Sequence, residues 1–270
     1  MRTLATNHRW VPLAWITVVA LAVLPAPAGA QLNPLWDHYK VYLVNPPVTI
    51  SIPPVTLIDQ FTQFTHTVEQ LERFANPTEK TVLTPPPAVT YPINDPNLHY
   101  AWWRISAQPF TGLITTTDQF GDHTLNIFDA VYLLNPALKS LTGIPTGDLP
   151  SANHYKCYNC QGSPVDVAVR MTDQFGPWDA TVLSPRLFCN PVEKRIDAAN
   201  VYPILDPEQH YTCYEFQTED PHIFGAFIKD QFTEHGVELG PSRLLCVPTL
   251  KHGVTSTGGS TWGKIKVLYR

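Results

Sequence analysis

Histidine and aspartate recur at matched positions in four segments of this chain, and these residue types are suited to acid–base or metal chemistry. In each segment a His-Tyr pair precedes an Asp-Gln-Phe triplet. The polar members are His38, Asp59, His99, Asp118, His154, Asp173, His210 and Asp230. A histidine near a carboxylate is part of a catalytic triad or of a metal site. Four copies instead favour a structural motif, since an active site is rarely built four times in one chain and an aspartate at a turn commonly caps backbone amides.

The triplets begin blocks of constant length, and this regularity predicts an internal repeat. Each block ends on a lysine that lies 21 positions after its aspartate, with no gap in any copy. The closing lysines are Lys80, Lys139, Lys194 and Lys251. We therefore divide the chain into four copies of about 56 residues.

Apolar and polar residues alternate in the best-defined copy, which is the pattern of a half-buried strand. Val165, Val167, Val169 and Met171 share one parity. Together with 27 prolines, which suit turns and sheet edges, this pattern predicts an all-β protein with about four short strands in each copy.

The linkers predict how the copies combine. A single copy buries too little surface to be stable alone. The linkers at 91–100 and 202–211 resemble each other, whereas the middle linker at 141–153 differs and is rich in Gly and Pro. We therefore expect paired copies that form two small β-sandwich or β-barrel domains, residues 31–145 and 151–270, with the choice between sandwich and barrel left open.

The N-terminal region has the features of a secretory signal peptide over residues 1–30. Arg2 and Arg9 precede an apolar run at 10–24, and Ala28-Gly29-Ala30 supplies a cleavage site. An uncleaved anchor is the alternative, but the run is short for a membrane span. We expect no transmembrane segment after cleavage and a secreted or cell-envelope location, either extracellular or periplasmic.

The charge balance argues against one class of partner. The formal net charge of the whole chain is −5, and loss of Arg2 and Arg9 with the signal makes it −7. No basic run is present in the sequence. Nucleic-acid binding is not expected, because phosphate contacts need clustered Lys and Arg.

Four of the five cysteines occupy equal positions in the last two copies, which predicts one disulfide in each. The expected bonds are Cys157–Cys189 and Cys213–Cys246. In the first two copies the same positions hold apolar pairs, Val41 with Ala75 and Trp102 with Leu134. Both cysteines are present or both absent in every copy, as a disulfide requires, and an exported chain permits the bond.

Cys160 is left without an intramolecular partner. Cys157 and Cys160 together make a C-x-x-C pair, which can serve in redox chemistry or zinc binding. Since Cys157 has a better-matched partner, we expect Cys160 to be a free thiol or to form an intermolecular bridge.

Catalytic motifs are absent from the sequence. It contains no G-x-S-x-G, H-E-x-x-H, P-loop or EF-hand pattern. We therefore expect no enzyme activity, no cofactor and no bound metal. Trp178 follows the turn of copy 3 and is a candidate for contact with a partner, because exposed aromatic rings stack on sugars or anchor proteins.

The motifs of the last two copies resemble a known type of domain. His-Tyr-x-Cys-Tyr, Asp-Gln-Phe-Gly and Leu-x-Cys-x-Pro-x-x-Lys are similar to an uncharacterised tandem repeat domain of exported bacterial proteins. Copies 1 and 2 depart from it by lacking the cysteines, and copies 1 and 4 have Thr62 and Thr233 in place of the glycine. The resemblance implies an exported bacterial protein and carries over no catalytic residue.

These observations predict a non-catalytic exported protein that acts in surface display, adhesion or envelope structure. Repeated units suit multivalent attachment, and the expected partner is an extracellular or envelope protein or glycan. The alternative is a secreted hydrolase with its site in the cleft between the two domains.

Overall fold

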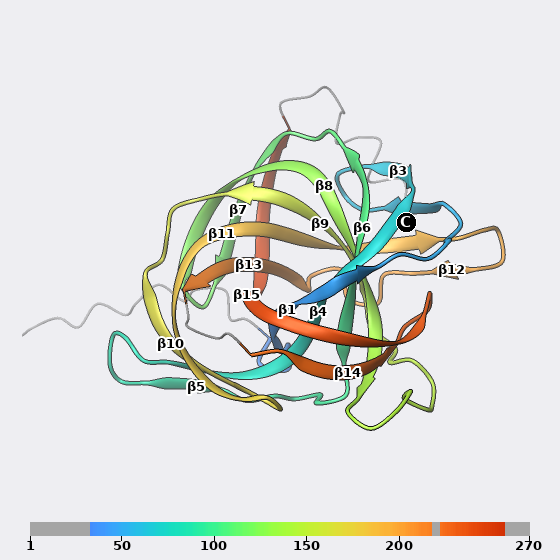
Figure 1. Cartoon of the computed structure of the whole chain (residues 1–270). Helices are drawn as coiled ribbons and strands as arrows, with labels where there is room; N and C mark the ends of the chain where they lie inside the picture. Colours follow the sequence, from blue (N-terminus) through green and yellow to red (C-terminus); the bar gives the residue numbers. More distant parts are fainter. Residues whose placement is uncertain (1–32, 218–221, 257–270) are drawn as a thin grey trace, which may run out of the picture.

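The computed structural model describes residues 33–217 and 222–256, drawn in colour in Figure 1. The expected signal peptide at 1–30 lies outside the described residues. The described residues form 15 strands and no helix, so the prediction of an all-β protein is confirmed.

Each copy contributes strands in the same order. The first strands of the four copies are β1 (His38–Val48), β6 (His99–Gln108), β9 (His154–Gln161) and β13 (His210–Gln217). The hairpin strands that end near Asp-Gln-Phe are β2 (Val55–Ile58), β7 (Gly112–Asp118), β10 (Val167–Asp173) and β14 (Phe224–Lys229). The long strands that follow are β4 (Val68–Val82), β8 (Gly121–Ser140), β11 (Gly176–Arg195) and β15 (Glu234–Ser256). Shorter additions are β3 (Gln63–His66), β5 (Val89–Tyr91) and β12 (Val201–Tyr202).

The first strands and the long strands form a closed antiparallel ring. The order is β1, β4, β6, β8, β9, β11, β13, β15 and back to β1. In Figure 1, blue β1 lies beside orange-red β15, so the first and last strands of the described chain are hydrogen-bonded neighbours. Closure removes the unpaired strand edges that would otherwise favour aggregation.

The hairpin strands connect copies that are not neighbours in the ring. Each pairs with the far end of the long strand two copies away: β2 with β11, β7 with β15, β10 with β4 and β14 with β8. The main hydrophobic cluster likewise joins Tyr42 and Trp103 to Val192 and Leu239.

The expected division into residues 31–145 and 151–270 therefore does not describe the strand pairing. Strands of both halves belong to the same sheet, and residues of both halves form its main hydrophobic core. The matching linkers join copies that follow each other in the chain. Linker similarity carries no information on ring closure or on the pairing of hairpins with long strands two copies away.

The long strands replace the several short strands expected in each copy. Each carries a break in register at the residue 13 positions after its aspartate, namely Glu72, Val131, Arg186 and Arg243. Such a β-bulge bends a strand and redirects a side chain without ending the strand. The alternation of apolar and polar residues is interrupted at these positions, which is why short strands were expected. The hydrogen-bonded ladder nevertheless continues past each bulge.

Four buried tyrosines lie around the axis of the ring. They are the tyrosines of the His-Tyr pairs, Tyr39, Tyr100, Tyr155 and Tyr211. Neighbouring ring centroids are 5.1–5.6 Å apart, and the rings meet edge to face. This arrangement is favourable for aromatic quadrupoles, and it fills the interior with one side chain from each copy.

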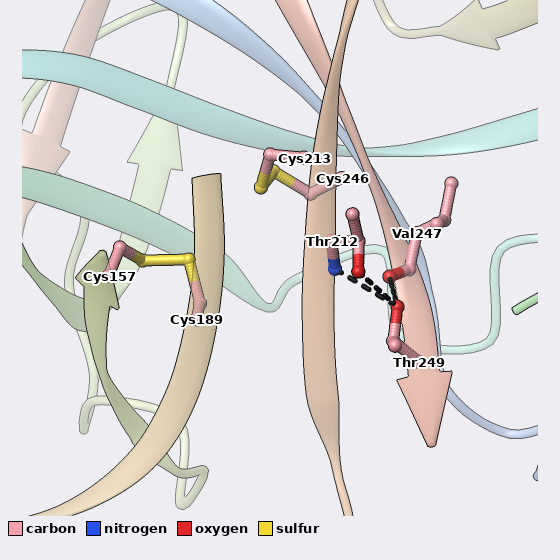
Figure 2. Close-up of a disulfide and its surroundings, with 7 residues drawn as sticks. All are labelled: Cys157, Cys189, Thr212, Cys213, Cys246, Val247 and Thr249. Atoms are coloured by element: carbon pink, nitrogen blue, oxygen red, sulfur yellow. Dashed lines mark hydrogen bonds between the residues drawn. A yellow bond between two sulfur atoms is a disulfide. The ribbon is translucent and has the colours of Figure 1, made fainter. Parts of the chain in front are cut away.

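The disulfides occupy the next layer of the same interior. Cys157–Cys189 and Cys213–Cys246 link residues that face each other on paired strands, with Cα atoms 4.0 and 3.9 Å apart (Figure 2). Val41 faces Ala75 and Trp102 faces Leu134 at the equivalent places. The structure thus contains both expected disulfides, and the other two copies fill the layer by apolar packing.

The equivalence of these positions predicts that an apolar pair can replace a disulfide. Cys157→Val with Cys189→Ala reproduces the Val41–Ala75 pair and should give a folded protein. Its free energy of unfolding, measured by chemical denaturation, should fall by about 3–4 kcal/mol because the unfolded chain loses a cross-link. Cys160→Ala is the control for loss of a buried sulfur and should cost about 1 kcal/mol. Equal losses in the two variants would contradict the prediction.

Candidate functional site

The aspartates of the repeated motif hold their own turns. In every copy Oδ1 accepts a hydrogen bond from the backbone N–H two residues later, at 2.8–3.0 Å. In copies 2 and 3 a glycine closes the turn, and Gly176 adopts φ +119°, which side chains disfavour. In copies 1 and 4 the N–H groups of Thr62 and Thr233 also donate to the aspartate.

The second carboxylate oxygen of each aspartate reaches a copy on the opposite side of the ring. Oδ2 accepts a hydrogen bond of 2.6–2.7 Å from a buried aromatic side chain two copies away. The pairs are Asp59 with Tyr158, Asp118 with Tyr214, Asp173 with Tyr42 and Asp230 with Trp103. Each aspartate therefore cross-links the fold, which is a structural role.

Asparagines and lysines extend this network. Asn76, Asn135 and Asn190 donate to Asp173, Asp230 and Asp59, and each accepts a hydrogen bond from the closing lysine of the next copy. Copy 4 has Val247 at this place, so the buried Lys80 Nζ has no hydrogen-bond acceptor among the described residues. Burial lowers the pKa of Lys80 well below its usual value, and nearby Asp118 opposes that shift.

The histidines are buried at the same end of the ring, and most contact a glutamine of the motif. His38 Nε2 lies 2.6 Å from Gln119 Oε1, and His210 Nε2 lies 3.0 Å from Gln60 Nε2. His154 is hydrogen-bonded to Gln231, while His99 packs on Phe74. Burial lowers the pKa of all four, and an adjacent lysine adds to the shift in each case. The motif residues are thus brought together as internal cross-links.

Cys160 is a free thiol in the structure and is buried in an apolar cluster with Phe61 and Phe188. Burial raises the pKa of the thiol, although Arg186 opposes this shift. A buried, protonated thiol is a poor nucleophile. An intermolecular bridge through Cys160 would need local opening of the cluster.

Trp178 lies on β11 and is half-buried. Its ring lies 4.8 Å from the ammonium of the buried Lys40 and 5.1 Å from the ring of His222. A cation held over an indole is stabilised by the ring quadrupole. The ring thus has a structural role in covering Lys40, and contact with a partner stays a prediction.

A cavity of about 870 Å³ lies at the other end of the ring from the tyrosine layer. Its lining includes Arg73, Arg104, Arg186 and Arg243, which are four of the six arginines in the described residues. Leu187 and Leu244, which belong to the same buried cluster as the four tyrosines, also line it. We call this feature the arginine cavity.

The arginine cavity has an excess of positive charge. Glu215 is its one acidic lining residue, and it accepts a hydrogen bond of 2.6 Å from Arg186. Arg73 and Arg104 both lie over the ring of Tyr132, at 5.4 and 5.5 Å from its centroid. Within the described ranges, Arg104 and Arg243 have no ion-pair partner. The excess of cationic side chains suits this cavity to an anionic ligand.

Sequence reasoning did not identify this cavity because its arginines are far apart in the chain. Arg186 and Arg243 occupy the same position in copies 3 and 4, and that match was an available signal. Arg73 and Arg104 lie on a long strand and a first strand of other copies. Only closure of the ring brings the four side chains to one end.

The comparisons with known proteins place the chain in a family. A model of the family DUF7450, described as a repeat of unknown function, matches residues 99–248. The chain belongs to this family. No curated protein and no solved structure matches the chain. Membership in DUF7450 agrees with the expected repeat and assigns no activity.

No group of three or more His, Cys, Asp and Glu side chains in the described residues could hold a metal ion. No helix in this part of the chain is long and apolar enough to cross a membrane.

The unequal lysine sites predict opposite effects of one substitution. Lys194→Met removes the donor to Asn135 Oδ1 and the buried cation beside Asp230, so it should lower the free energy of unfolding by about 3–5 kcal/mol. Lys80→Met removes a buried ammonium that has no acceptor, so it should be neutral or stabilising. Chemical denaturation of the two variants is the test, and equal destabilisation would contradict it.

The buried histidines predict loss of stability in acid. Their folded-state pKa values lie below the unfolded value of about 6.5, and that of His99 is about 3. The unfolded chain therefore binds more protons between these values, and stability falls as pH drops from about 6.5 toward 3. His99→Gln should flatten this dependence by up to about 1.4 kcal/mol per pH unit between pH 6 and 4. The exposed His235→Gln is the control, and an unchanged slope for His99→Gln would refute the prediction.

Proposed function

We propose that this protein is a non-catalytic, exported binding protein that acts in surface display, adhesion or envelope structure. Two observations support a passive scaffold. The histidines and aspartates of the motif are hydrogen-bonded or packed within the fold. Two disulfides are compatible with an oxidising compartment, extracellular or periplasmic.

The observation that carries the proposal is the arginine cavity. One end of the ring is filled by the tyrosine layer and the polar network, whereas the other holds a cavity of about 870 Å³. That volume lies in the range of ligand sites in proteins. Most of the cavity's polar lining residues are arginines and amides, which bind ligands without needing to react with them.

The secreted hydrolase is the less favoured alternative. His154, the motif histidine whose replacement would abolish activity in a hydrolase, is buried and hydrogen-bonded to Gln231. The cleft between two domains, where the hydrolase site was expected, has no counterpart in the strand pairing.

The proposal predicts that the protein binds cell-surface material. Purified residues 31–270, with disulfides formed, should sediment with intact cells or isolated envelopes of the source organism in a saturable way. Fractionation of that organism should place the native protein outside the cytoplasm. The same protein with its disulfides reduced and unfolded is the control for non-specific adsorption.

Two results would overturn the proposal. One is failure to bind cells, envelopes and glycans alike. The other is turnover of a substrate in a hydrolase panel that is abolished by His154→Ala in a variant that still folds.

A further inference from the structure

We propose that the arginine cavity binds an acidic oligosaccharide, with arginine side chains holding carboxylate or sulfate groups and neighbouring polar and aromatic groups holding the sugar. This inference rests on the proposed binding function and specifies its ligand. The arginines, the rings and amides beside them, and the overall charge of the chain support it separately.

The first half of the cavity holds two guanidinium groups close to one ring. Arg73 and Arg104 lie 5.4 and 5.5 Å from the centroid of Tyr132. Arg73 Nε donates to the Tyr132 hydroxyl at 3.3 Å, and that hydroxyl donates to Glu72 Oε2 at 2.7 Å. The Tyr132 ring thus keeps two like charges near one another, and an anion bound beside them would offset their repulsion.

The second half of the cavity holds the arginines at the bulge positions. The bulges interrupt the ladder at Arg186 and Arg243, and both side chains line the cavity. Arg186 pairs with Glu215, but the two side chains are 51% and 41% exposed, so the pair contributes little stability. An incoming carboxylate can compete for Arg186, and Arg243 is available beside it.

The remaining lining suits a sugar. Phe128 supplies aromatic surface, and Asn159 and Gln161 supply amide donors and acceptors. Glu215 can accept hydrogen bonds from hydroxyl groups. A ligand that carries both hydroxyls and separated acidic groups satisfies this mixture of side chains.

The overall charge disfavours a densely charged polymer. The chain from residue 31 onward carries a formal charge of −7, and the arginine cavity is a local exception. Long stretches of polyphosphate would meet repulsion outside the cavity and at Glu215. A short segment or the end of a sparsely charged glycan would place its acidic groups among the arginines and avoid this repulsion.

The test is a calorimetric titration of residues 31–270 with a short oligogalacturonate. The matched ligand control is the same oligomer with its carboxylates methyl-esterified, which keeps the sugar and removes the charge. We expect binding of the acid form, no binding of the ester, and loss of affinity as ionic strength rises from about 0.05 M to about 0.5 M.

Paired variants locate the site. Arg104→Gln with Arg243→Gln should weaken binding by about tenfold or more, the loss expected for removing charged donors. Arg170→Gln with Arg195→Gln removes the same charge from exposed residues outside the cavity and should change affinity less than about twofold. If the cavity variant fails to fold, the comparison of acid with ester and the salt titration, both on the unmodified protein, still test whether binding depends on the ligand's charge.

Several outcomes would overturn the inference. They are equal binding of acid and ester, equal loss in the two double variants, or preferential binding of polyphosphate or polyglutamate. Binding to envelopes without any binding of the oligogalacturonate or of a sulfated oligosaccharide would also refute it, but would leave the proposed function intact. Failure to bind envelopes as well would remove both.

Discussion

The hydrogen bonds of the four buried aspartates constrain the whole structure. One oxygen of each carboxylate holds the turn of its own copy, and the other accepts from an aromatic side chain two copies away. A buried carboxylate is costly unless its acceptor sites are filled, so the turn and the distant aromatic side chain must be placed together. Since each aspartate needs the opposite copy, no pair of adjacent copies can satisfy the network alone.

Ring closure follows from the same requirement. With β1 against β15, every first strand has a long strand on both sides, and every hairpin reaches the long strand opposite. The interior is then filled in layers, four tyrosines in one and two disulfides with two apolar pairs in the next. Copy 4 lacks one member of the network, because Val247 stands where the other copies have an asparagine. As a result Lys80 has no hydrogen-bond acceptor among the described residues, and His123 contacts Asp118.

The two ends of the ring have different chemistry as a result. The end with the His-Tyr pairs holds lysines, histidines and glutamines whose hydrogen bonds and ring contacts lie within the protein. The opposite end holds exposed arginines at two of the four bulges and no comparable set of internal partners in the described residues. A β-bulge bends a strand and also redirects a side chain. The bulges at Arg186 and Arg243 therefore also direct these two arginines toward the cavity. We therefore propose that ligands bind at that end.

The sequence by itself determined the period of the repeat, the all-β class and the pairing of the cysteines. These features depend on residues at equal positions within one copy, such as Cys157 with Cys189, and on local alternation of apolar residues. It did not determine which copies pair, since β4 meets β10 through closure of a ring and not through proximity in the chain. Nor did it reveal the arginine cavity, because Arg73, Arg104, Arg186 and Arg243 are separated along the chain. Only the tertiary structure, by bringing the ends of four copies around one axis, places these charges together.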